Sequence, residues 1–66
     1  MQLQFNDEKI ETLASNLEEL LYEMSLSTKT GIAVAVNDFV VQRPLWKTKM
    51  LNEQDVVLVI TAAAGG

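Results

Sequence analysis

The sequence predicts an α+β roll, in which one main helix packs across a mixed sheet of four to five strands. Three observations support this fold class. The length of 66 residues allows one domain. Strand-like segments lie on both sides of the only segment with a clear helical period. The final strand-like segment is apolar at every position, as strands in the middle of a sheet often are.

The chain is expected to begin with a β-hairpin. Apolar and polar residues alternate over residues 1–5, which is the period of a strand with one buried face. Residues 6–8, Asn-Asp-Glu, have the composition of a turn. Residues 9–13 then alternate again and are predicted to return antiparallel to the first strand.

The helix is predicted from four apolar side chains with the spacing i, i+3, i+4 and i+7, namely Leu17, Leu20, Leu21 and Met24. Its first residue is left open by the sequence. Ser15 can cap the helix together with Glu18, or Asn16 can cap it together with Glu19, because both pairs have the spacing of a capping box.

After the helix, residues 25–31 are predicted to form a loop because Ser, Thr and Gly dominate them. Residues 32–36 alternate large β-branched side chains with alanine, which predicts a strand whose branched side faces the helix. Residues 37–38 form a turn, and the short strand 39–41 is ended by Arg43-Pro44.

The final third of the chain contains the strand that we expect in the middle of the sheet. Residues 45–51 show no clear period, and residues 52–55 form a polar turn. Residues 56–60 are continuously apolar, which predicts a strand buried on both faces. A right-handed crossover would place it beside the first strand.

Composition excludes several classes of function. The chain has no Cys and no His, which removes thiolate nucleophiles, catalytic triads and zinc sites, so we expect no metal and no bound cofactor. The formal net charge of −4 has the wrong sign for binding nucleic acid or anionic membranes. No apolar run approaches the ~20 residues of a membrane span, and residues 1–8 do not resemble a secretory signal. We expect a cytoplasmic monomer.

The end of the sequence is the candidate reactive site. Residues 62–66, Ala-Ala-Ala-Gly-Gly, follow the predicted domain 1–61 and are expected to form a flexible tail. The α-carboxylate of Gly66 is a poor electrophile unless it is activated, most commonly by attack on the α-phosphate of ATP. Glycine lacks a Cβ, so Gly65 and Gly66 allow the backbone to approach closely to a nucleotide site on another protein. A frayed terminus without function is the alternative interpretation.

The sequence resembles the sulfur carrier proteins of thiamine biosynthesis, the ThiS family, over its whole length. The resemblance is carried by Val36-Asn37 before a turn, Val41, Arg43 and Trp46 after it, and Ala64-Gly65-Gly66 at the end. It implies the β-grasp, or ubiquitin-like, fold. It also implies a carrier that is not itself an enzyme, with Gly66 as the position of adenylation and sulfur attachment and Ala64, Gly65 and Gly66 threading into partner active sites.

The resemblance also implies three partners. A ubiquitin-activator-like adenylyltransferase of the ThiF type would adenylate Gly66 and consume ATP. A cysteine desulfurase system would supply sulfur, giving a C-terminal thiocarboxylate. Thiazole synthase, of the ThiG type, would accept that sulfur for the thiazole ring of thiamine.

Three other functions are compatible with the same features. The chain could be the small sulfur-carrying subunit of molybdopterin synthase, a ubiquitin-like modifier joined to lysines, or a β-grasp binding module whose tail is idle. Two further features are expected to be structural: Trp46 is expected to be a core residue and not a partner anchor, and the acidic residues Glu18, Glu19 and Glu23 are expected to form a solvated helix face and not a docking surface for a basic partner.

Overall fold

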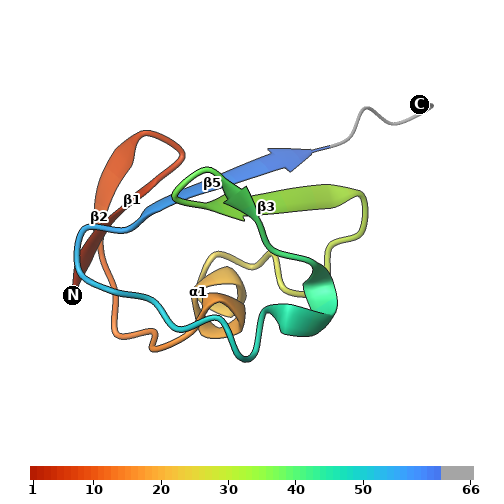
Figure 1. Cartoon of the computed structure of the whole chain (residues 1–66), viewed down its shortest axis with the longest axis horizontal. Coiled ribbons are helices and arrows are strands. Elements are labelled where there is room, and N and C mark those ends of the chain that lie inside the picture. The colour runs from red at the N-terminus through yellow and green to blue at the C-terminus, as the bar shows by residue number, and fades with distance from the viewer. Residues whose placement is uncertain (62–66) are drawn as a thin grey trace.

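The computed structural model describes residues 1–61 and confirms the predicted order of elements. Figure 1 shows a sheet with the helix packed against one of its faces. The elements are β1 (Gln2–Phe5), β2 (Glu8–Glu11), α1 (Leu17–Glu23), β3 (Ile32–Val36), β4 (Phe39–Val40), the 3₁₀ helix η1 (Arg43–Leu45) and β5 (Val56–Thr61).

The five strands form one mixed sheet in the order β2-β1-β5-β3-β4. β1 pairs parallel with β5, whereas the β1–β2, β3–β5 and β3–β4 pairs are antiparallel. The last strand in the sequence is therefore the central strand, and it lies beside the first, as predicted. The α+β roll is confirmed.

Two tight turns connect the antiparallel hairpins. Asn6 and Asp7 join β1 to β2 with φ of 49° and 70°, and Asn37 and Asp38 join β3 to β4 with φ of 51° and 74°. A two-residue hairpin turn with both φ angles positive matches the twist of the flanking strands, and Asn and Asp tolerate this conformation better than other residues with a side chain. The polar pairs predicted as turns therefore fix the register of both hairpins.

Asn16 is the residue that caps α1. Its Oδ1 accepts a hydrogen bond from the backbone N–H of Glu19 at 2.8 Å. The carboxylate of Glu19 in turn accepts the backbone N–H of Ser15 at 2.7 Å. The structure thus selects the second of the two predicted caps, and two free N–H groups at the helix start gain partners.

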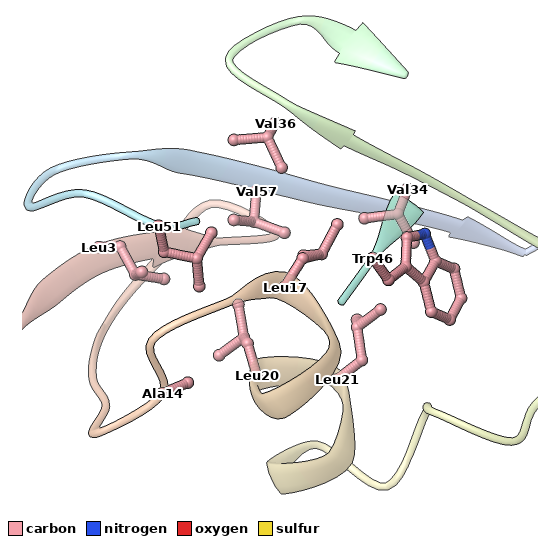
Figure 2. Packing of buried hydrophobic residues seen from close by; sticks show 10 residues of the cluster. All are labelled: Leu3, Ala14, Leu17, Leu20, Leu21, Val34, Val36, Trp46, Leu51 and Val57. Atoms are coloured by element: carbon pink, nitrogen blue, oxygen red, sulfur yellow. The ribbon is translucent and has the colours of Figure 1, made fainter. Parts of the chain in front are cut away.

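The core lies between α1 and the face of the sheet turned towards it (Figure 2). Trp46 is 2% exposed and donates its indole N–H to the carbonyl of Val41 at 2.9 Å, so its predicted role in the core is confirmed. The buried hydrophobic residues are Leu3, Ala14, Leu17, Leu20, Leu21, Val34, Val36, Trp46, Leu51 and Val57.

The prediction that β5 is buried on both faces is wrong. Val57 is fully buried against α1, but Val56, Leu58 and Ile60 are 42%, 41% and 56% exposed. Among the described residues, a single layer of helix and loop packs on one face of the sheet, and none of their elements covers the opposite face (Figure 1). A continuously apolar strand in the middle of the sheet therefore leaves alternate side chains in solvent.

Candidate functional site

The start of β5 is fixed by a buried carboxylate. Asp55 is 7% exposed, and its two oxygens accept hydrogen bonds from Asn37 Nδ2 at 2.9 Å and from the backbone N–H of Asn52 at 2.8 Å. The side-chain oxygen of Asn37 accepts the backbone N–H of Val56 at 2.9 Å. The turn between β3 and β4 is thus bonded directly to the first residue of β5.

A second asparagine supports β5 further along the strand. The β1–β5 pairing covers Gln4↔Val56 and Phe5↔Val57 and then stops, because Asn6 already belongs to the hairpin turn. The side-chain Oδ1 of Asn6 accepts the backbone N–H of Val59 at 2.8 Å and so replaces the missing strand partner. β5 continues beyond β1 to Thr61, which directly precedes the predicted tail.

One half of the open sheet face is apolar. The register β4–β3–β5 aligns Val40, Ala35 and Leu58 across three strands. We call the apolar residues of β3, β4 and β5 on this face the open-face patch: Val40, Ala33, Ala35, Val56, Leu58 and Ile60.

The other half of the same face is polar. Gln4 of β1 lies beside Val56 and is paired with Lys9 of β2, and Gln2 is paired with Glu11. The polar half places amide and charged side chains in solvent. The open-face patch places a valine, a leucine and an isoleucine of β5 there, next to the end of the strand from which residues 62–66 continue. Apolar groups concentrated on one exposed face are typical of an interaction surface.

Gly66, the residue predicted to react, and Ala64 and Gly65, predicted to thread with it into partner active sites, lie outside the described residues, as does the whole predicted tail 62–66. Their roles in adenylation, sulfur attachment and threading stay predictions. The structure describes residues 1–61, which precede them, and the last of these residues, Thr61, ends β5.

The open-face patch is not predicted by the sequence pattern. The signal is present in the continuous apolar run of residues 56–60, but such a run predicts burial on both faces of the strand. The number of layers packed on the sheet decides whether such a run is buried on one side or on both, and residues 1–61 contain only one amphipathic helix that can cover the sheet.

Residues 1–61 contain no group of three or more acidic, His or Cys side chains arranged to hold a metal ion. Within the same residues, no helix is both long enough and apolar enough to cross a bilayer.

Comparison with known proteins shows that nearly the whole chain matches one protein family. The family model described as "ThiS family" matches residues 2–66. Among curated proteins, the sulfur carrier protein ThiS of Escherichia coli (strain K12) is 30% identical over 66 residues, and the match covers 100% of both chains.

Solved structures agree on the fold. The crystal structure of the thiamine biosynthesis protein (ThiS) from Geobacter metallireducens matches with a TM-score of 0.85 at 22% identity, covering 100% of both chains. An NMR solution structure of a thiamine biosynthesis protein from the same organism matches with a TM-score of 0.76 at 23% identity, covering 100% of this chain and 88% of that one. The mixed five-stranded sheet with one helix is the β-grasp arrangement. By its fold and by the match of residues 2–66, the chain belongs to the ThiS family of sulfur carrier proteins.

Proposed function

We propose that the chain carries sulfur as a C-terminal thiocarboxylate on Gly66 for formation of the thiazole of thiamine. The observation that supports this most is the extent of the family match, which runs through residue 66 and so includes both terminal glycines. The curated relative, which has the same length as this chain, is itself described as a sulfur carrier.

The chemistry proceeds in three steps on the terminal carboxyl group. The Gly66 carboxylate attacks the α-phosphate of ATP, releasing pyrophosphate and forming an acyl-adenylate. A persulfide, whose outer sulfur a desulfurase takes from cysteine, then attacks the carbonyl carbon through that sulfur, so that AMP leaves and an acyl disulfide forms. A thiol cleaves the S–S bond of the acyl disulfide, becomes disulfide-bonded to the sulfur donor and leaves the thiocarboxylate, a tethered nucleophile that thiazole synthase can use without free sulfide. The chain supplies the reacting group, and the partner enzymes supply the catalysis.

The small tail residues suit passage into another protein's active site. Ala64 adds one methyl group, and Gly65 and Gly66 add no side chain at all. A narrow channel can therefore enclose the backbone on all sides, which is the geometry that brings a carboxylate to a bound nucleotide. Larger residues at 65 or 66 would hold the carboxylate back from the phosphate.

The open-face patch is the surface on which we propose that the activating enzyme docks. β5 supplies Val56, Leu58 and Ile60 to the patch and continues directly into the tail. An enzyme bound to this patch therefore holds the tail close to its own nucleotide site. Burial of these side chains supplies binding energy that does not depend on the reacting atoms.

Adenylation is tested by exchange of labelled pyrophosphate into ATP, catalysed by a ThiF-type enzyme in the presence of the chain. We expect exchange with the full chain and none with a variant lacking Gly65 and Gly66. The truncated variant should still compete with the full chain, because the patch is retained. Exchange that continues after truncation would exclude Gly66 as the adenylated group.

Docking is tested by the double variant Leu58→Thr/Ile60→Thr, with Gln4→Thr as the matched control on the polar half of the same face. The double variant should raise the KM for the chain in the exchange reaction about tenfold or more, since two exposed aliphatic side chains lose part of their burial. The control should leave KM within about twofold of the parent. Equal effects of both variants would contradict docking on the patch.

A further inference from the structure

A second surface lies on the far side of α1 from the sheet. The groove has a volume of about 630 Å³ and runs between the outward side of α1, the segment before it and the loop after it. We call it the helix groove. Its walls carry Leu13, Tyr22, the acidic residues Glu18, Glu19 and Glu23, and Thr28. The buried stripe of α1, Leu17, Leu20 and Leu21, faces the core instead, so the helix groove lies on the side of α1 that is turned away from the sheet. Figure 1 shows that α1 packs on one face of the sheet, and the open-face patch belongs to the opposite face.

The local backbone holds Leu13 in solvent. Its neighbours Thr12 and Ala14 are 4% and 3% exposed, and in an extended segment the residue between two buried ones points outward. Leu13 is consequently 94% exposed, the highest value among the large hydrophobic side chains of the described residues. Tyr22, on the facing wall, is 76% exposed. Two large apolar groups thus border a groove in which neither is covered.

Hydrogen bonds hold the walls of the groove in place. The hydroxyl of Thr12 accepts the backbone N–H of Ala14 at 3.0 Å and donates to Glu23 Oε1 at 2.5 Å, which ties the segment before α1 to the end of the helix. On the other wall, Arg43 donates to the carbonyl of Ser27 at 2.8 Å. A surface whose backbone is already fixed loses little conformational entropy when a ligand binds.

The charge around the groove has one sign. Three of the chain's nine acidic residues line it, and no Lys or Arg is among the residues that do. The guanidinium of Arg43 approaches from outside but is engaged by the carbonyls of Ser27 and Lys29 and stacks over Trp46, with its carbon 4.3 Å from the ring centroid. A ligand of the helix groove that covers Leu13 and Tyr22 therefore needs aliphatic groups flanked by positively charged groups.

We propose that the helix groove binds a basic, leucine-bearing segment of a partner protein. The aliphatic side chain of the segment packs between Leu13 and Tyr22, and its cationic side chains pair with Glu18, Glu19 and Glu23. The site is separate from the open-face patch and from the tail, so the two surfaces can be occupied at the same time. The proposal does not depend on sulfur transfer at Gly66.

The probe is a blocked hexapeptide, Lys-Leu-Arg-Lys-Leu-Arg, titrated into the isotope-labelled full chain while backbone amide shifts are recorded. We expect saturable shift changes centred on Leu13, Tyr22 and Thr28. A peptide with glycine in place of both leucines should bind at least about fivefold more weakly, since the apolar contact is lost. Shift changes centred on the open-face patch, or equal affinity of the glycine peptide, would overturn the proposal.

Two pairs of variants separate groove binding from general attraction to an acidic protein. Leu13→Ser should weaken binding about tenfold, whereas Leu45→Ser, at a leucine that is 55% exposed outside the groove, should leave it unchanged. Glu18→Gln should weaken binding more than Glu8→Gln, which removes the same charge elsewhere. Equal effects of the two variants within either pair would exclude a basic, leucine-bearing segment as the ligand of the groove. The same conclusion would follow if the peptide does not bind and the chain instead self-associates in a way that Leu13→Ser abolishes.

Discussion

Asp55 and Thr12 are the two buried polar side chains in the described part of the chain. Both are satisfied by hydrogen bonds, and no buried side-chain nitrogen or oxygen of residues 1–61 lacks a partner. Each joins two segments that are distant in sequence. Asp55 links the β3–β4 turn to the start of β5, and Thr12 links the end of the first hairpin to α1.

We expect Asp55→Ala to lower the free energy of unfolding by about 1–3 kcal/mol, because the amide of Asn37 and the N–H of Asn52 lose their acceptors. The measurement is urea unfolding followed by far-UV circular dichroism. Glu8→Ala, which removes the same charge from an exposed position of β2, should change stability by less than about 0.5 kcal/mol. Equal effects of the two variants would show that the buried network contributes nothing specific.

Trp46 provides a second prediction for a single residue. Trp46→Phe removes the indole N–H bond to Val41, weakens the stacking of Arg43 and leaves unfilled space in the core. We expect a loss of about 2 kcal/mol in the free energy of unfolding. Tyr22→Phe, at a ring that is 76% exposed, is the control and should be nearly neutral. A Trp46→Phe variant as stable as the parent would contradict the packing described for the core.

At the scale of elements, the strands and the helix were predictable because the local sequence signals for each element agree with the way in which that element packs in the fold. The hairpin turns carry Asn-Asp pairs suited to positive φ, and the helix carries one apolar stripe. Two features could not be predicted. The choice between Ser15 and Asn16 as helix cap depends on the path of the chain before α1, and the exposure of β5 depends on how many layers cover the sheet.

The helix cap gives a prediction at this scale. Asn16→Ala should destabilise the protein by about 1 kcal/mol, because the N–H of Glu19 loses its side-chain acceptor. Ser15→Ala should be nearly neutral, since only the backbone N–H of Ser15 takes part in the cap. Thermal unfolding of the two variants measures the difference. A larger loss in Ser15→Ala than in Asn16→Ala would reverse the assignment of the cap.

At the scale of the whole molecule, the two faces of the fold serve different purposes. One face of the sheet packs on α1 and holds β5 in the middle, supported by Asp55 at one end and by Asn6 further along. The other face leaves the open-face patch exposed beside the end of β5. The sequence was sufficient to predict this central strand, because its apolar residues are adjacent in sequence. The reactive tail stays a prediction, since residues 62–66 lie outside the described residues. The sequence contains the apolar residues of the patch, but their exposure could not be predicted because it depends on how many layers cover the sheet.

The central claim is that the terminal carboxyl group of Gly66 acquires sulfur. The most direct measurement is the intact mass of the full chain after incubation with its activating enzyme, ATP, cysteine, a cysteine desulfurase and a thiol reductant. We predict a gain equal to the mass difference between sulfur and oxygen, located on the C-terminal glycine by fragmentation and absent when ATP is omitted. An unchanged mass, with an activating enzyme that demonstrably forms the adenylate, would contradict the account.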